Sequence, residues 1–356
     1  MAGDGGAGGP AQVHDEVLGA LRRAAFLLER GGATSYRADA FRAAVRALER
    51  LDPAELGARL RAGTLTDLPG VGARTAEVAA AAAAGGSVPY LVDLEARYPA
   101  AEATGPGAEL RAALRGDLHA HTEASDGSTT IQEMVLAAME LGHEYLAITD
   151  HSPRLTVANG LSAARLRAQL DQIEALNRAI APFRVLTGIE VDILDDGTLD
   201  QEPDLLDRLD VVVGSVHSKL RMDAASMTRR MRAAVANPRL DVLGHCTGRQ
   251  LTGKRQRPQS EFDAAAVFAD CAEHGVAVEV NCRPDRLDPP HALLDVAVPA
   301  GCLFTVDTDA HAPGQLSWQP VGCDRAAAHG IGPDRVLDAW PLDRLLGHLG
   351  DRRVGA

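Results

Sequence analysis

The sequence has few of the features that would place a chain in a membrane, a secretory route or a disulfide-rich class. Its longest apolar run is the alanine-rich stretch Val78–Ala84, far short of the roughly 20 residues that a membrane span needs. Residues 1–10 lack the basic start and apolar stretch of a signal peptide. The five cysteines are odd in number and show no CxxC spacing, so they indicate neither a disulfide framework nor a zinc ribbon. We therefore expect a cytoplasmic globular protein with reduced thiols and no membrane partner.

Lysine is nearly absent, because Lys219 and Lys254 are the only two in 356 residues. The net charge of −13 argues against a chain that simply coats nucleic acid. In residues 1–100, 11 Arg nearly balance 12 Asp and Glu, so the negative charge is concentrated in the C-terminal part. This distribution is expected where carboxylates gather around metal ions. The length suits two domains, and a hydrophobic content of 46% is enough for a buried core.

Helical periodicity dominates the first hundred residues. Apolar residues recur at helical spacing over residues 13–51, which predicts two amphipathic helices divided by Gly31-Gly32. Asp52-Pro53 marks the start of a third helix, because Asp is a good cap and Pro is favoured at the first helical position. A fourth helix is expected to begin near Ala73.

Composition also predicts the domain boundaries. The Gly-rich residues 1–11 are expected to be disordered, and residues 12–97 to form an all-helical domain. Pro and Gly in residues 98–114 predict a linker. Over residues 115–350 short apolar segments such as Tyr145–Ile148 and Val242–Leu243 alternate with helix-like stretches, as in βα repeats around a parallel sheet or barrel. In such folds the functional site lies on the loops that follow the strands.

Polar clusters follow the predicted strand ends. Residues i and i+2 of an extended segment point the same way, so His119 and His121 can face one ion, as can Asp309 and His311. A single histidine in such a place is more often structural than a ligand, but coincidence at seven ends is much less probable. Imidazole and carboxylate ligands suit manganese, zinc or iron. The clusters contain Asp117, His119 and His121; Ser125, Asp126 and Gly127; Asp150 and His151; Glu190; His217; His245; and Asp307, Asp309 and His311.

The motif order HxH, SDG, TDH, GIEVDIL, SVHS, GH and TDAH resembles that of the PHP (polymerase and histidinol phosphatase) family. It is most similar to the PHP domain at the C-terminus of bacterial family X DNA polymerases, over about Arg115–Leu346. The resemblance implies a distorted (β/α)7 barrel that hydrolyses phosphate esters with a hydroxide bridging two of three divalent metal ions. It also implies the ligand sets, which are His119, His121, Glu190 and Asp309 for one ion, Glu190 as the bridge to a second ion on His217 and His245, and Asp126, His151 and His311 for a third.

Other residues near these ends are candidates for catalysis or substrate binding. Asp150 would either orient a ligating histidine or carry a proton, and the orienting role is favoured because such histidines usually need a partner on the other nitrogen. Arg249, as a further catalytic candidate, and Lys219, Arg283 and Arg286 could grip a substrate phosphate. A surface ion pair is an equally good explanation for each of these four cations.

The segment Leu68-Pro69-Gly70-Val71-Gly72 resembles the tip of a helix-hairpin-helix motif, in which glycines let backbone N–H groups approach a DNA phosphate. Residues 13–94 resemble the helical DNA-end-binding domain of family X polymerases. The predicted DNA contacts are Leu68, Gly70, Val71 and Gly72. Residues 84–117 leave no room for a polymerase palm, so we expect no nucleotide polymerisation. The helical domain has no lysine for Schiff-base lyase chemistry, and its near-neutral charge predicts weak, salt-sensitive DNA contact.

Three functions stay open at this point. The first is a DNA-directed phosphoesterase, either a 3′–5′ exonuclease or an enzyme that processes 3′-phosphates or abasic sites at DNA ends. The second is a small-molecule phosphatase of the histidinol-phosphatase type. The third is a non-catalytic DNA-binding accessory protein, which the complete ligand set opposes. The partners are thus DNA ends or a small phosphate ester, and no obligate protein partner is evident.

Overall fold

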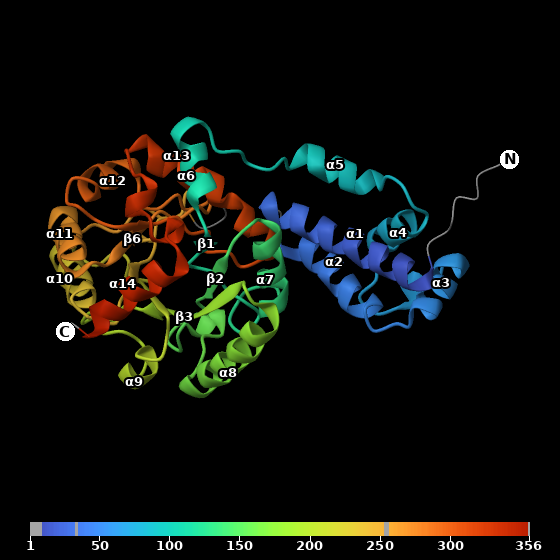
Figure 1. Cartoon of the computed structure of the whole chain (residues 1–356), viewed down its shortest axis with the longest axis horizontal. Coiled ribbons are helices and arrows are strands. Elements are labelled where there is room, and N and C mark those ends of the chain that lie inside the picture. Colours follow the sequence, from blue (N-terminus) through green and yellow to red (C-terminus); the bar gives the residue numbers. More distant parts are fainter. Residues whose placement is uncertain (1–8, 33–34, 253–255, 355–356) are drawn as a thin grey trace. The chain divides into compact units, whose positions relative to one another are not determined.

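The computed structural model describes residues 9–32, 35–252 and 256–354, and it divides into two compact units, residues 1–100 and 101–356 (Figure 1). The predicted disordered segment 1–11 falls mostly outside the described residues, and helix is present from Pro10. Among the described helices, none combines the length and the apolar character that crossing a membrane requires.

The first unit is all-helical, as predicted, with α1 in contact with four other helices. Asp52 accepts a hydrogen bond from the N–H of Ala54 at 2.8 Å and caps α3, which confirms the predicted start at Asp52-Pro53. The start of α4 at Ala73 is also confirmed, whereas α5 was not predicted. The elements are α1 (Pro10–Arg30), α2 (Ser35–Leu48), α3 (Pro53–Ala62), the 3-10 helix η1 (Leu65–Asp67), α4 (Ala73–Ala83) and α5 (Pro89–Arg97).

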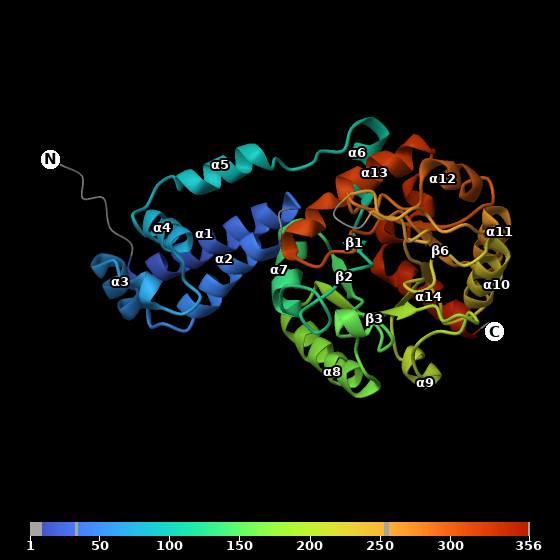
Figure 2. The ribbon, with the colours of Figure 1, turned by 180° about the vertical axis from the view of Figure 1, so that it is seen from behind.

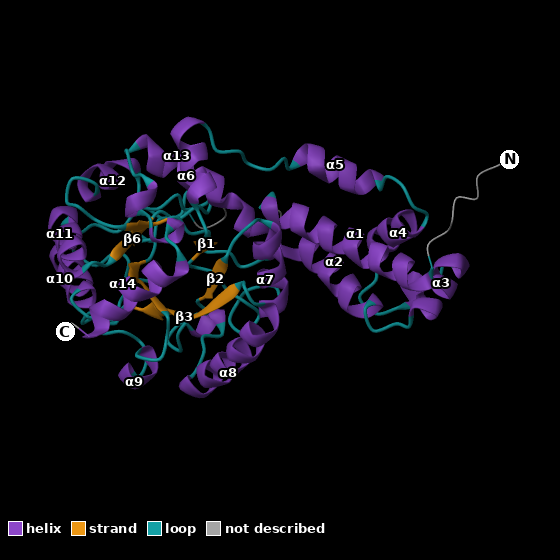
Figure 3. Ribbon diagram, in the orientation of Figure 1, coloured by secondary structure: helices purple, strands orange, loops and turns teal. Residues whose placement is uncertain are grey.

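The second unit is built on seven parallel strands that pair in chain order. The strands are buried along nearly their whole length, which explains their almost continuous apolar sequences. Figure 3 shows the strands surrounded by helices. The strands are β1 (Gly116–Asp117), β2 (Tyr145–Ile148), β3 (Arg184–Asp192), β4 (Val211–Ser215), β5 (Val242–Leu243), β6 (Ala277–Glu279) and β7 (Phe304–Thr305).

Helices connect and cover these strands, as Figure 2 shows from behind. The α-helices are α6 (Gly105–Ala113), α7 (Ile131–Glu140), α8 (Ala163–Ile180), α9 (Pro203–Leu206), α10 (Ala224–Val235), α11 (Ala264–His274), α12 (His291–Ala297), α13 (Gln319–Ala328) and α14 (Leu342–Val354). The 3-10 helices are η2 (Thr156–Ala158), η3 (Pro313–Trp318), η4 (Pro333–Arg335) and η5 (Leu337–Ala339).

The barrel closes only at the carboxyl ends of its strands. Within the described residues β1 and β7 share no strand pairing, but a parallel bridge joins Ala120 to Ala310 just beyond them. The N–H of His121 donates to the carbonyl of Ala310 at 2.8 Å. The predicted distorted (β/α)7 barrel is therefore confirmed, and its closure places the HxH and TDAH segments side by side.

The other end of the barrel is filled by α14. Leu345 and Leu349 of this helix are buried with Leu118 and with inward residues of the strands. Arg352 and Arg353 donate to Asp241, which is fully buried just before β5. Because the amino ends are plugged, the opposite ends are left for the polar clusters.

The segment predicted as a linker, residues 98–114, contains α6. This helix packs on α13, and the N–H of Thr104 just before it donates to Asp324 at 2.8 Å. Helix α6 therefore belongs to the second unit, and the connection between the units is shorter than composition suggested.

Candidate metal centre

The polar clusters meet at the carboxyl ends of the strands, where the loops of a parallel barrel converge. His119 and His121 follow β1, His151 follows β2, and Asp309 and His311 follow β7. Glu190 lies within β3, just before the strand ends at Asp192, so it projects from the strand itself.

His217 and His245 complete the ring, following β4 and β5. The structure thus brings all nine residues predicted as metal ligands to one end of the barrel. Their side chains form three groups that are suited to metal ions, and some residues belong to two of them. The groups are His119, His121 and Glu190; His151, Glu190 and His217; and His121, Asp126, His151 and His311.

The first group is fully buried. The Nε2 atoms of His119 and His121 lie 3.5 Å and 3.6 Å from Oε2 of Glu190. Oδ1 of Asp309 lies 3.3 Å from Nε2 of His121 and 3.9 Å from Nε2 of His119. These are separations between atoms that could share one ion, and the four residues are the set that the PHP resemblance implies.

Glu190 faces different histidines with its two carboxylate oxygens. Oε1 lies 2.9 Å from Nε2 of His245 and 3.3 Å from Nε2 of His217. Oε2 faces the first group and also lies 2.8 Å from Nδ1 of His151. A carboxylate in this position can bridge two ions, which is the arrangement expected from the sequence.

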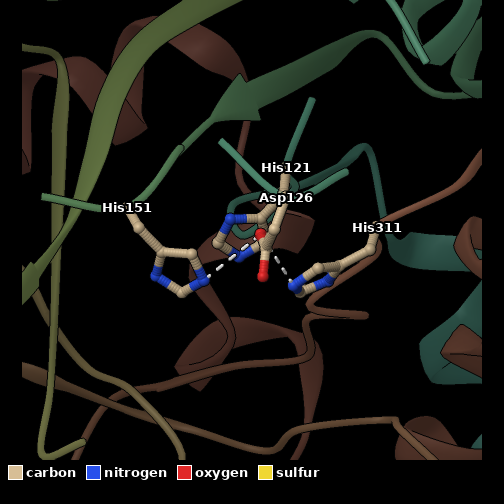
Figure 4. Close-up of side chains that lie close together, drawn as sticks. All are labelled: His121, Asp126, His151 and His311. Atoms are coloured by element: carbon tan, nitrogen blue, oxygen red, sulfur yellow. Dashed lines mark ion pairs between the residues drawn. The ribbon is translucent and has the colours of Figure 1, made fainter. Parts of the chain in front are cut away.

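The third group is the most open of the three. Figure 4 shows Asp126 between His151 and His311, with His121 behind it. Oδ1 of Asp126 lies 3.5 Å from Nε2 of His151 and 3.4 Å from Nε2 of His311. The side chain of Asp126 is 36% exposed, whereas those of the first group are buried. We call Asp126, His151 and His311 the outer group.

Unsatisfied buried atoms test whether the residues fit metal ions. Nε2 of His119, Nε2 of His121 and both carboxylate oxygens of Glu190 are buried and lack a hydrogen-bond partner among the described residues. Buried polar atoms are rarely left in this state. Several such atoms converging at 2.8–3.9 Å without hydrogen-bond geometry fit a set of ligands around divalent ions.

The charges of the carboxylates agree with that role. Burial would raise the pKa of Glu190, but His151 and His217 hold it well below its usual range. Burial likewise opposes ionisation of Asp309, while Arg283 and His119 keep its pKa well below the usual range. Both carboxylates are therefore ionised at neutral pH, as metal ligands must be.

Partners behind the histidines fix which nitrogen faces the site. Nδ1 of His119 lies 2.6 Å from Oε1 of Glu279, and Nδ1 of His217 lies 2.9 Å from Oδ1 of Asp192. With Nδ1 carrying the proton, each Nε2 is free to bind an ion. Sequence reasoning missed Glu279 and Asp192. The available signal was the i, i+2 spacing of Asp192 from Glu190 in β3.

One strand end was assigned to the wrong segment. The sequence predicts that Ser125-Asp126-Gly127 follows a strand of its own, but Asp126 lies in the loop after β1. The remaining strand end is that of β6, which carries Glu279 and is followed by Asn281. Nδ2 of Asn281 donates to Asp309 at 3.2 Å, so this end also contacts the site.

Asp150 does not contact a histidine in the way that was predicted. Its carboxylate accepts hydrogen bonds from the N–H and hydroxyl of Thr122 at 2.8 Å and 2.6 Å. It also accepts from the hydroxyl of Ser125 and from Nε2 of Gln169, at 2.5 Å and 2.6 Å. Asp150 therefore holds the loop that carries Asp126, and its catalytic role stays a prediction.

The four candidate cations separate into two kinds. Arg283 lies 3.6 Å from Oδ1 of Asp309 and Arg286 lies 3.4 Å from Oδ2, so both border the centre. Arg249 instead donates to the backbone carbonyls of Arg286 and Leu287, and Lys219 pairs with Asp195. Its carbonyl contacts show that Arg249 holds the loop after β6, and its catalytic assignment stays a prediction.

The predicted hairpin tip lies in the first unit, between η1 and α4. Gly70 has a φ of +89°, a conformation that favours glycine. The N–H of Gly72 donates to Oγ1 of Thr75 at 3.0 Å, and Val71 is buried. The segment is therefore a tight turn that leads into α4, and the helix-hairpin-helix assignment stays a prediction.

Comparison with known proteins identifies the second unit. Residues 117–283 match the model of the PHP domain. The second unit is a PHP phosphoesterase domain. The chain is 38% identical over 229 residues to the DNA polymerase/3′-5′ exonuclease PolX of Bacillus subtilis, which covers 64% of this chain and 40% of PolX. The chain therefore spans less than half the length of that relative.

Two other known proteins are similar to this chain over most of their own length. The probable phosphatase YcdX of Escherichia coli is 27% identical over 246 residues, covering 66% of this chain and 94% of YcdX. The crystal structure of histidinol phosphate phosphatase from Lactococcus lactis is similar over 61% of this chain and 94% of its own, with 17% identity and a TM-score of 0.44. Nearly the whole of YcdX is therefore matched by about two thirds of this chain.

Proposed function

We propose that the chain hydrolyses phosphate esters at DNA ends, as a 3′–5′ exonuclease or a 3′-end or abasic-site processing enzyme, with three divalent ions of manganese, zinc or iron. The observation that carries the choice of DNA is a pocket in the helical unit that combines arginines with aromatic rings beside the hairpin tip. The similarity to PolX, a relative named as a 3′-5′ exonuclease, supports the same choice.

The residues of the metal centre would bind the three ions in separate sets. His119, His121, Glu190 and Asp309 would hold one ion, His217 and His245 a second that Glu190 shares, and the outer group a third. Bound ions of this kind supply a hydroxide nucleophile at neutral pH and neutralise charge on the phosphoryl oxygens. Arg283 and Arg286 border Asp309 and could bind the same phosphoryl group through their guanidinium N–H donors.

The pocket in the helical unit has a volume of about 680 Å³. Arg37, Arg74 and Arg97 line it together with Tyr36 and Tyr90. The Arg74 guanidinium lies over the Tyr90 ring at 5.2 Å, and the Tyr36 side chain is 81% exposed. Guanidinium groups that bind phosphates and aromatic faces that stack on bases are the two parts of a single-strand binding site.

Acidic neighbours do not cancel this charge. Arg74 pairs with Glu77, and Arg97 pairs with Asp93, but all four side chains are about half exposed. Exposed pairs of this kind contribute at most about 1 kcal/mol, so a phosphate can compete with them. Three arginines against two carboxylates leave the pocket positive, within a domain that is close to neutral overall.

The test compares two substrates in one protein. We expect Arg37→Ala with Arg74→Ala to raise KM for a 3′-recessed DNA by about tenfold or more, because two phosphate contacts are lost. Hydrolysis of histidinol phosphate, which needs only the metal centre, should not change. Arg22→Ala serves as the matched control, because Arg22 is an exposed arginine of the same unit that pairs with Glu49 outside the pocket. A KM for DNA that matches the control would contradict the role of the pocket.

The alternative is a small-molecule phosphatase, which the nearly full-length match to the probable phosphatase YcdX favours. It would be supported if histidinol phosphate turned over while DNA was not degraded. His119→Ala with His121→Ala should abolish bound metal and hydrolysis of either substrate. A phosphoesterase domain with all nine predicted ligands gathered at one end argues against a non-catalytic role.

A further inference from the structure

Two residues of α8 hold the loop that carries Asp126 through hydrogen bonds, and neither is a metal ligand. We infer that Gln169 and Arg165 are positioning residues for the outer group, which rests on the proposed three-ion centre. They lie four residues apart, and therefore on the same face of the helix. Each reaches the loop through a different set of hydrogen bonds.

Gln169 is buried and supports the loop indirectly, through Asp150. It is 4% exposed, and its Nε2 donates to Asp150 at 2.6 Å. The other hydrogen bonds of Asp150 go to Thr122 and Ser125, which shortly precede Asp126. Four hydrogen bonds to one buried carboxylate thus connect α8 with the backbone that aims the Asp126 side chain.

Arg165 acts at the loop surface. Its guanidinium donates to the carbonyl of Ala124, and also to the carbonyls of Asn159 and Gly160 at 2.8 Å and 3.2 Å. Nδ2 of Asn159 donates to the same carbonyl of Ala124 at 3.3 Å. Arg165 therefore fastens the Asp126 loop to the loop after β2, which carries His151.

The two contacts should affect the outer group more than the first group, because the first group is also anchored from β1. His119 and His121 are fixed by β1 and by the bridge between Ala120 and Ala310. Asp126 sits five residues beyond His121 on a loop, with a side chain that is 36% exposed. Loosening that loop should lower the affinity of one ion while the ions on the buried ligands remain.

The experiment measures metal stoichiometry and affinity in the full chain. Wild-type protein, Gln169→Leu, Arg165→Ala and Asp126→Ala are stripped of metal, titrated with Mn²⁺ by calorimetry, and analysed for bound metal by mass spectrometry. We expect Gln169→Leu and Arg165→Ala to weaken one ion by about 10- to 100-fold, as for other residues behind metal ligands, and to leave the rest unchanged. Asp126→Ala should lose the same ion.

Gln172→Leu is the matched control, because Gln172 is an exposed glutamine of the same helix. Unchanged affinity for every ion in both Gln169→Leu and Arg165→Ala would overturn the inference. If Gln169→Leu does not fold, the exposed Arg165 decides, since Arg165→Ala either weakens the one ion or refutes the role. Wild-type protein that binds fewer than three ions would instead overturn the proposed function, so the two failures are distinguishable.

Discussion

Replacing Glu279 by Gln tests whether the hydrogen bond of Glu279 to His119 prepares that histidine to bind a metal ion. Oε1 of Glu279 lies 2.6 Å from Nδ1 of His119, while Oε2 accepts from the N–H of His245 and from Nδ2 of Asn281. A glutamine has one carbonyl oxygen and one NH₂ group in their place. Whichever way the amide turns, its NH₂ group faces a donor or forces the proton of His119 onto Nε2.

The magnitude follows from this mismatch. A buried donor left without an acceptor costs about 1–3 kcal/mol, and losing the partner behind a ligating histidine costs about 10- to 100-fold in metal affinity. Because tenfold corresponds to about 1.4 kcal/mol, the two ranges agree. We expect Glu279→Gln to weaken the ion on His119 by about 10- to 100-fold.

Calorimetric titration of metal-free protein with Mn²⁺ measures this affinity, and ¹⁵N NMR of the histidine rings reports which nitrogen carries the proton. Glu273→Gln is the control, because it makes the same change on the exposed surface of α11. Affinity equal to that of this control, with the proton of His119 still on Nδ1, would refute the reasoning. Glu279→Asp keeps the charge but shortens the side chain, so it should give an intermediate loss.

Three further predictions concern stability. Arg42 and Glu29 form a buried ion pair at 2.8 Å, so Arg42→Met should lower the free energy of unfolding of the helical unit by about 3–5 kcal/mol. The control Arg22→Met removes an exposed pair and should cost less than about 1 kcal/mol. Denaturant titration measures both free energies. Burial, with Arg111 nearby, lowers the pKa of His143 to about 4, so its contribution is complete above about pH 6.5 and is lost as the pH falls to 4. At about 1.36 kcal/mol per pKa unit the loss is about 3 kcal/mol, and thermal unfolding should show a shallower decline over that interval in His143→Gln. Chelation of bound metal should lower the free energy of unfolding by about 2.7 kcal/mol for each ion present at about 100 times its Kd, and an unchanged melting temperature after chelation would contradict the proposed centre.

Local elements could be predicted from the sequence where a local pattern specifies them. The strands β2 and β5 were predicted with the bounds that the structure shows, and α3 begins at Pro53 as its cap indicated. Helix α6 was missed. This helix begins with Gly105, Pro106 and Gly107, which also suit a linker.

The sequence by itself determined which residues gather at the metal centre, because a parallel barrel brings all its strand ends to one side. Only the tertiary structure decided which side chains form hydrogen bonds with these residues. Glu279 is separated from His119 by 160 residues, and Asp150 faces Thr122 and Gln169 instead of a histidine. Periodicity specifies the direction in which a side chain leaves its strand, but its partner depends on the shear and closure of the barrel, which are set by packing between segments far apart in the chain.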